Sequence, residues 1–243
     1  MKPILIIKTG NTVQTAYAKV GDFEKWFIES MQGEPDNFIV VEVFKGEKLP
    51  AVDEISGAAI TGSPAMVTDR LDWSEYTAEW LRQAIKTQLP IIGICYGHQL
   101  LAHALGGRVD YHPQGREIGT TLVTPLIENI ESNEDRLFSE IKESFSVHVS
   151  HMQTVVELPI DAIVLASNHF EPHHAVKFSD FCWGLQFHPE FEEVAMLSYI
   201  EERQEDLKSE GMDIESLLSG VKPTLVARNI LNDFYKLTKD YSV

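Results

Sequence analysis

The sequence predicts an α/β protein with a central, mostly parallel β-sheet and helices on both faces. Two short, continuous apolar runs, Ile4 to Ile7 and the stretch that ends at Cys95, are typical of strands buried on both sides. Stretches with helical spacing of apolar residues separate such runs along the chain. A length of 243 residues with 44% hydrophobic and 23% charged side chains allows one large domain with a full core.

In the first half of the chain, strands and helices alternate. Phe23, Trp26 and Phe27 share one side of an expected helix, and Pro90 precedes the apolar strand that ends at Cys95. An alternating order of this kind implies parallel strands joined by crossover helices. We expect strands at residues 4–7, 38–44, 58–61 and 91–95, and helices at 23–31, 73–86 and 99–105.

The second half changes character. Between Arg108 and Glu190 the sequence predicts short strands at 120–124, 145–149, 155–158, 162–166, 175–178 and 183–187, with a short helix at Arg136 to Ser144. Helical patterns return through Ser209 and from Thr224 to Leu237. Since no repeat or linker marks a boundary, we expect a single domain over 1–243, with its core at about 1–200 and a helical extension at about 201–243.

Charge and cysteine content limit the classes of function. The chain has 20 basic and 37 acidic side chains, a formal charge of −17, which argues against nucleic-acid and membrane-surface partners. No apolar run approaches the roughly 18 residues of a membrane helix. The two cysteines, Cys95 and Cys182, form no disulfide framework, so we expect a reducing, cytoplasmic setting and a buried core thiol at Cys182.

Cys95 is the candidate nucleophile. The segment Gly93-Ile94-Cys95-Tyr96-Gly97 places it at a sharp turn from strand to helix, where the two glycines remove side chains from the bend. The free N–H groups at the start of the new helix favour the thiolate, and the Tyr96 backbone N–H is available to a developing oxyanion. An unpaired cysteine at a strand end is otherwise usually a small core residue.

A second segment supplies the base. His188 and Glu190 are two residues apart after the apolar run Trp183 to Phe187, so both side chains can face the same way. The carboxylate can then orient the imidazole while the imidazole takes the thiol proton. Cys95, His188 and Glu190 together predict a cysteine-nucleophile enzyme that catalyses acyl transfer.

The motifs Gly-Ile-Cys-Tyr-Gly-His-Gln and Gln-Phe-His-Pro-Glu resemble those of the triad-type class I glutamine amidotransferases, in particular the glutaminase domain of GMP synthase and its free-standing homologues. The resemblance extends from the first strand to His-Pro-Glu and implies a single flavodoxin-like domain. It also implies attack by Cys95 on the side-chain amide of L-glutamine, with His188 as base, Glu190 as the orienting carboxylate and no cofactor. A γ-glutamyl thioester then forms, ammonia leaves, and water regenerates the enzyme.

The same resemblance implies further site residues. Thr61-Gly62-Ser63-Pro64 is similar to the family's oxyanion turn, with Ser63 in place of a second glycine. Gln99 matches the glutamine that contacts substrate. Ser150 and His151 match a Ser-His-Gly-Asp segment whose backbone holds the ends of the substrate, whereas Met152 and Gln153 depart from that segment. The resemblance therefore does not define the far wall of the pocket, where an open wall would admit a γ-glutamyl peptide and a closed wall only a carboxamide.

Three functions are consistent with these motifs. The first is a glutaminase that releases ammonia for a separate synthetase, because the sequence contains no phosphate-binding loop of a nucleotide-activating domain. The second is a γ-glutamyl peptidase or hydrolase, which uses the same thioester without a partner. The third is a binding protein without turnover, which the intact Cys95, His188 and Glu190 disfavour. No metal site is expected, since His98 and His103, and likewise His173 and His174, lack ligand spacing.

Overall fold

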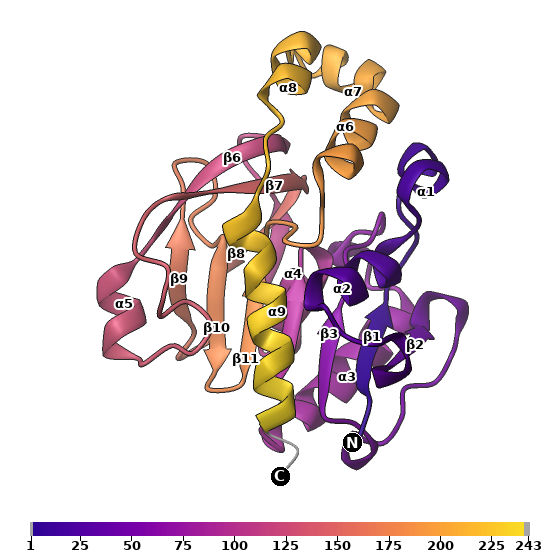
Figure 1. The fold of residues 1–243 in the computed structure, drawn as a ribbon, viewed down its shortest axis with the longest axis vertical. Helices are drawn as coiled ribbons and strands as arrows, with labels where there is room; N and C mark the ends of the chain where they lie inside the picture. Colours follow the sequence, from indigo (N-terminus) through magenta and orange to yellow (C-terminus); the bar gives the residue numbers. More distant parts are fainter. Residues whose placement is uncertain (1, 241–243) are drawn as a thin grey trace.

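The computed structural model describes residues 2–240, so Met1 and residues 241–243 of the predicted domain lie outside the described part. Its centre is a nine-stranded sheet (Figure 1). The strands follow one another in the order β2 (Phe38–Glu42), β1 (Ile4–Lys8), β3 (Gly57–Ile60), β4 (Ile91–Ile94), β11 (Cys182–Leu185), β10 (Ala175–Ser179), β9 (Ile163–Ser167), β6 (Glu117–Pro125) and β7 (Phe145–His151).

Strand direction changes at β11. The neighbours from β2 to β11 pair in parallel, whereas those from β11 to β7 pair antiparallel. A separate two-stranded sheet joins β5 (Arg108–Tyr111) to β8 (Gln153–Glu157). The predicted fold class is confirmed, and the antiparallel strands come from the strand-rich second half of the chain.

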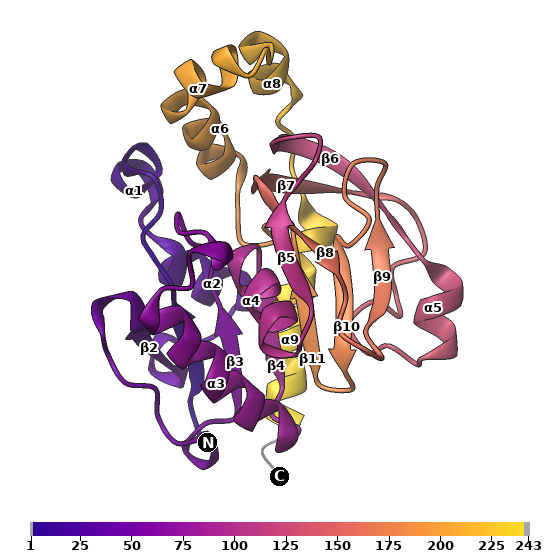
Figure 2. The same cartoon turned by 180° about the vertical axis from the view of Figure 1, so that it is seen from behind.

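Alternation along β1 divides the core into two layers. Ile4 and Ile6 pack on the side of α2 (Phe23–Met31) and α9 (Leu225–Asp240), while Leu5 and Ile7 pack on the side of α3 (Asp72–Lys86) and α4 (Tyr96–Ala104). Figures 1 and 2 show these helix pairs on opposite faces of the parallel strands. Successive side chains of a strand point to opposite faces, so a continuous apolar run fills both layers.

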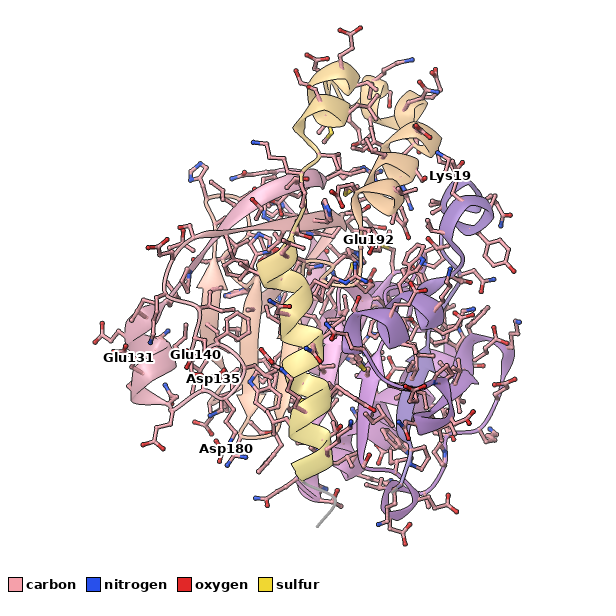
Figure 3. The ribbon with its side chains drawn as sticks, in the orientation of Figure 1. Lys19, Glu131, Asp135, Glu140, Asp180 and Glu192 are labelled. Atoms are coloured by element: carbon pink, nitrogen blue, oxygen red, sulfur yellow. The ribbon has the colours of Figure 1, made fainter. Side chains whose placement is uncertain are left out.

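Three helices lie beyond the carboxyl ends of the parallel strands: α6 (Glu193–Glu202), α7 (Gln204–Ser209) and α8 (Ile214–Gly220) (Figure 1). The helix α1 (Gln14–Val20), which carries the Lys19 labelled in Figure 3, lies beside α6. Lys19 forms an ion pair with Glu201 of α6 at 2.7 Å. These helices form a wall over the sheet edge at which β1, β3 and β4 end.

One predicted helix is wrong. Residues Arg136 to Ser144 form turns, and the helix in this region is α5 (Ile127–Ser132), upstream of the predicted range (Figure 3). The Asp135 carboxylate accepts hydrogen bonds from the Leu137 and Phe138 backbone N–H groups and from Trp183 Nε1. Asp135 is buried and its bonds fix a tight turn, so the chain bends at the point where a helix would have begun.

The other predicted elements are found with small shifts. The helix expected from residue 99 starts at Tyr96, and the strand expected to reach residue 44 ends at Glu42, before a short 3₁₀ turn. Three elements were not predicted, α1, α8 and β5, and each of them is seven residues long or shorter.

Candidate active site

Cys95 lies between β4 and α4 in a strained backbone conformation, with φ 51° and ψ −100°. A side chain is uncommon at positive φ, so the turn is held by its surroundings. A Cβ atom on Gly93 would lie 2.5 Å from the Gly97 backbone, and one on Gly97 would lie 2.7 Å from the Ile60 carbonyl oxygen. The two glycines are therefore required by close backbone packing, as the motif predicted.

The thiol itself is nearly buried. Cys95 is 8% exposed, its N–H donates to the Leu185 carbonyl at 2.7 Å, and its Sγ lies 3.8 Å from the Ser150 carbonyl oxygen. Cys95 is also the residue that precedes the first turn of α4, where backbone N–H groups lack intrahelical partners. The sulfur is thus positioned by three segments: the end of β4, the end of β11 and the end of β7.

His188 and Glu190 form a buried pair. His188 Nδ1 lies 2.8 Å from Glu190 Oε1, and both residues are 2% exposed. The imidazole stacks on the Phe191 ring at 4.1 Å between centroids, and the His188 N–H donates to the His148 carbonyl. Ring stacking and the carboxylate together fix the orientation of the imidazole.

The charges around His188 favour the imidazolium. Burial opposes protonation, but the Glu190 carboxylate and Cys95 outweigh it and raise the pKa of His188 from 6.5 to about 10. Cys95 also contributes a side-chain hydrogen bond to this shift. His188 is therefore suited to act as a general acid that already holds its proton.

The predicted oxyanion residues lie beside this pair. A Cβ atom on Gly62 would lie 3.0 Å from His188 Cε1, so the turn passes directly over the imidazole. Neither Gly62 nor Ser63 has positive φ, and the replacement of glycine by Ser63 therefore causes no backbone strain. The Ser63 hydroxyl donates to the Thr9 carbonyl and accepts from the Ala65 N–H, which ties the turn to the end of β1. Tyr96 begins α4 beside Cys95.

The predicted substrate residues have different surroundings. Gln99 is buried, and its Nε2 donates to the Gln153 carbonyl and to Gln186 Oε1, so both N–H groups of its amide are already bonded. Ser150 reaches Cys95 through its carbonyl. The His151 side chain turns inward, with Nε2 2.9 Å from Glu117 Oε2 and Nδ1 3.0 Å from the Gln153 carbonyl.

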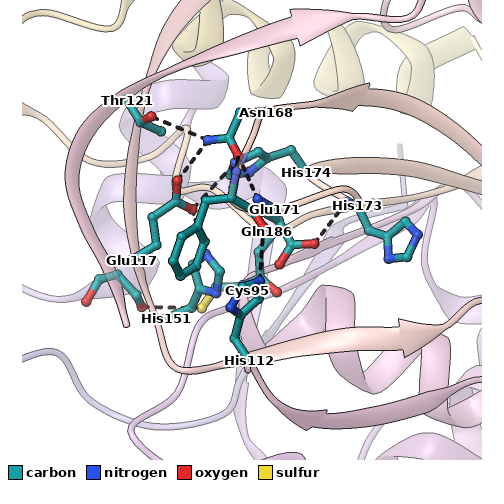
Figure 4. A network of polar contacts seen from close by, with 12 residues as sticks. Cys95, His112, Glu117, Thr121, His151, Asn168, Glu171, His173, His174 and Gln186 are labelled. Carbon is teal, nitrogen blue, oxygen red and sulfur yellow. Dashed lines mark hydrogen bonds and ion pairs between the residues drawn. The ribbon is translucent and has the colours of Figure 1, made fainter. Parts of the chain in front are cut away.

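A buried polar network supports the segment 150–153 from behind (Figure 4). Glu117 contacts His151 and lies 3.5 Å from His174, and it also accepts a hydrogen bond from Asn168. Burial opposes ionisation of Glu117, but the two histidines lower the pKa of its carboxyl group well below the usual range. The network therefore holds a charged carboxylate directly behind the strand end that faces Cys95.

Two hollows meet at Cys95. The larger, of about 710 Å³, contains His188 together with Thr9, Asn11, Phe23, Trp73, Tyr199, Glu202, Arg203 and Asp206. The smaller, of about 60 Å³, is bounded by Met66, Tyr96, Gln99, Arg116, His151, Met152, Gln153 and Arg203. Cys95, Ser63 and Ser150 line both hollows. The structure thus brings all the predicted site residues to one edge of the sheet.

Several residues that line the hollows have no signal in the local sequence. Thr9 follows β1, Tyr199 lies in α6, and Arg203 lies between α6 and α7. No local motif marks them, because they belong to the site only through the way α6 and α7 fold back over the sheet edge. Figure 1 shows this placement.

His98, His103 and Cys182 line neither hollow. His98 is fully buried next to Phe178, and burial lowers the pKa of its imidazole well below 6.5. His103 lies between Glu75 and Arg70. Cys182 is fully buried, as predicted, and burial raises the pKa of its thiol. Among residues 2–240, no group of three or more histidine, cysteine, aspartate or glutamate residues could hold a metal ion, and no helix is long and apolar enough to cross a membrane.

Solved structures share this fold. A glutamine amidotransferase from Thermotoga maritima superimposes with a TM-score of 0.76 over 98% of this chain and 98% of that chain, at 22% identity. A glutamine amido transferase from Methylobacillus flagellatus gives a TM-score of 0.75 over 99% of this chain and 95% of that chain, also at 22% identity. At this identity the likeness defines the class of fold.

The sequence itself defines the family. Residues 36–203 match the family described as glutamine amidotransferase class-I, and the chain belongs to this family of enzymes. It is 34% identical to a glutamine-hydrolysing GMP synthase of Porphyromonas gingivalis over 155 residues, which are 61% of this chain and 28% of that protein. The corresponding protein of Bacillus subtilis is 36% identical over 135 residues, which are 55% of this chain and 24% of that protein. The chain thus spans about a quarter of the length of these curated relatives.

Proposed function

We propose that this chain hydrolyses the side-chain amide of L-glutamine through a thioester on Cys95 and supplies the ammonia to a separate synthetase. The observation that carries the proposal is the convergence of Cys95 with the His188–Glu190 pair at the junction of two hollows. Family membership supports glutamine as the substrate class. The names of the relatives support an ammonia-accepting synthetase as partner.

In the proposed mechanism, the Cys95 thiolate attacks the γ-carbonyl carbon and the carbonyl oxygen becomes an oxyanion. Backbone N–H groups of Ser63 and Tyr96 stabilise that charge. His188 gives its proton to the leaving nitrogen as the C–N bond breaks, so ammonia departs and a γ-glutamyl thioester remains. Water, deprotonated by His188, then attacks the thioester, and glutamate and the Cys95 thiolate are regenerated with the proton back on His188. Glu190 orients the imidazole throughout.

A second candidate is hydrolysis of larger γ-glutamyl compounds without a partner. The hollow that contains His188, and would therefore receive the leaving group, has a volume of about 710 Å³. Ammonia requires little more space than a water molecule, about 30 Å³. The excess volume would accommodate the amino acid or amine released by a γ-glutamyl peptidase.

The deciding experiment measures ammonia release from L-glutamine beside amine release from a panel of γ-glutamyl dipeptides. The Cys95→Ser protein serves as the blank. Turnover of glutamine with little hydrolysis of the dipeptides supports the glutaminase, and a preference for the dipeptides supports the peptidase. Equal rates for the wild-type and Cys95→Ser proteins would refute the thioester mechanism common to both.

Two further expectations belong to this proposal. A cysteine nucleophile needs a reduced thiol, and both Cys95 and Cys182 are free, which fits a reducing, cytoplasmic setting. The chain would act as one domain, with the extension after about residue 200 forming part of the wall of the site through Arg203 and Asp206.

A further inference from the structure

We propose that Arg203 binds the α-carboxylate of the γ-glutamyl substrate and thereby selects for it, an inference that rests on the proposed function. Arg203 lies at the junction of α6 and α7 and lines both hollows together with Cys95. It would act as a specificity-determining residue that takes no part in the proton transfers.

The small hollow differs in charge from the rest of the molecule. The chain has 37 acidic and 20 basic residues, yet the described residues that line this hollow include two arginines and neither an aspartate nor a glutamate. A hollow whose lining includes cationic side chains and no carboxylate favours an anionic ligand group. Its position next to Cys95 places that group on the substrate.

Of the two arginines, Arg116 is already neutralised. Its Nε lies 2.9 Å from Glu210 Oε2 and its Nη2 lies 2.9 Å from Glu210 Oε1, a bidentate ion pair. The Arg203 side chain forms no ion pair with any described residue, and its buried Nε has no hydrogen-bond partner there. Arg203 is half-buried and lines the hollow without an acidic partner, so it is the cation that a substrate carboxylate would pair with.

The backbone around Arg203 is firmly held. The neighbouring Glu202 carboxylate accepts hydrogen bonds from the Gln14 and Thr15 N–H groups, which fixes the end of α6 to the start of α1. The Arg203 guanidinium lies over the Tyr199 ring at 5.6 Å from the centroid, and the Tyr199 hydroxyl contacts Thr12. A cation with few conformations available loses little entropy when it binds an anion, which suits a recognition role.

The orientation of the substrate relative to His188 indicates which of its carboxylates Arg203 would bind. The leaving nitrogen must face His188, and His188 lines only the large hollow, so the glutamyl chain extends toward the small hollow. The carboxylate of a leaving peptide would instead enter the large hollow, where the carboxylates of Glu202 and Asp206 lie in the lining beside Arg203. Gln153 also lines the small hollow; its Nε2 donates to the Thr68 hydroxyl, and its buried Oε1 has no hydrogen-bond partner among the described residues. An acceptor there complements the α-ammonium group of the same substrate.

Binding to a chemically inert site tests this assignment directly. In the Cys95→Ser background, calorimetry measures the dissociation constants of L-glutamine and of 4-aminobutanamide, which lacks only the α-carboxylate. Arg203→Gln should weaken binding of L-glutamine about 10- to 100-fold, the size of a charge-assisted hydrogen bond, and should leave 4-aminobutanamide unchanged. Arg203→Lys should regain part of the loss.

The matched control is Lys208→Gln, which removes one positive charge from α7 at a residue that lines neither hollow. The control should change neither dissociation constant, and thermal unfolding of each variant checks that the fold is intact.

Several outcomes would overturn the proposal. The first is equal binding of L-glutamine to the Cys95→Ser protein with and without the Arg203→Gln substitution. The second is a loss of 4-aminobutanamide affinity as large as the loss of L-glutamine affinity. The third is that L-glutamine binds to neither of these two proteins. The proposal would also be overturned if Arg203→Gln weakened binding of a γ-glutamyl dipeptide but did not weaken binding of the same dipeptide with an amidated C-terminus. Arg203 would then bind the C-terminal carboxylate of the leaving residue. Turnover by the Cys95 enzyme is measured separately, so failure of the proposed function and failure of this assignment remain distinguishable.

Discussion

Glu190→Gln isolates the electrostatic role of the carboxylate. The substitution keeps the size of the side chain and removes the charge that lies 2.8 Å from His188 Nδ1. The pKa of His188 is raised from 6.5 to about 10. A shift of this size corresponds to about 5 kcal/mol in favour of the imidazolium, to which Glu190 and Cys95 both contribute.

Loss of the Glu190 charge should therefore lower the pKa of His188 by at least about one pH unit, or about 1.4 kcal/mol. Because Glu190 orients the ring and does not transfer the proton, kcat should fall about 10⁴-fold, compared with about 10⁶-fold for His188→Ala, the difference known for carboxylate and base in a triad. The measurements are steady-state turnover and titration of the His188 ring by NMR, with the resonance assigned from its loss in His188→Ala.

Glu192→Gln is the matched control, since Glu192 is an exposed carboxylate two residues further on that pairs with Arg228 (Figure 3). It should leave both kcat and the His188 titration unchanged. Equal losses of kcat in Glu190→Gln and His188→Ala would show that Glu190 does more than orient the ring. An unchanged His188 pKa in Glu190→Gln would refute the electrostatic argument itself.

The geometry supports three further predictions. Cys95→Ser should abolish turnover with an unchanged unfolding temperature, and residual activity above a small fraction of wild type would exclude Cys95 as nucleophile. Gly97→Ala should cost about 1–3 kcal/mol in urea unfolding, because its Cβ would lie 2.7 Å from the Ile60 carbonyl oxygen, whereas Gly220→Ala, with nothing within 4 Å, should cost little. Burial and the nearby His188 lower the pKa of His148 from 6.5 to about 4. Between these two pH values the unfolded chain binds a proton at His148 that the folded chain does not. The free energy of unfolding should therefore fall by about 3 kcal/mol between pH 6.5 and pH 4. His148→Gln should flatten that decline in urea titrations at pH 7 and pH 4, and an identical decline in the variant would contradict the assignment to His148.

The parts of the fold and site that were predictable are those specified by local sequence. A nucleophile turn needs glycines at fixed spacing, so Gly93 and Gly97 mark Cys95 without reference to any other segment. His188 and Glu190 are close in sequence and act together, so their spacing also carries the signal. Buried parallel strands consist of continuous apolar runs, which made β1 and β4 visible.

The parts that were not predictable depend on tertiary contacts. The segment after Asp135 has apolar residues at helical spacing, but the bond from Trp183 Nε1 and the backbone bonds to the Asp135 carboxylate favour a turn. Arg203 has no neighbouring motif, and its importance comes from its place over Cys95 and from the absence of an ion pair with any described residue. A sequence pattern cannot report either property.

The residues that are predictable from local sequence are those proposed to carry the reaction, whereas the residue proposed to recognise the substrate depends on tertiary contacts. Cys95 and the His188–Glu190 pair lie on segments that directly follow strands of the central sheet, where close packing allows little movement. Arg203 lies between two helices beyond that sheet, α6 and α7, and these helices line the large hollow through Tyr199, Glu202 and Asp206. The reacting groups can therefore keep their geometry while the helical segment changes in sequence. If Arg203 selects the α-carboxylate, substitutions in this segment would alter which amide is hydrolysed while leaving the capacity to form a thioester intact.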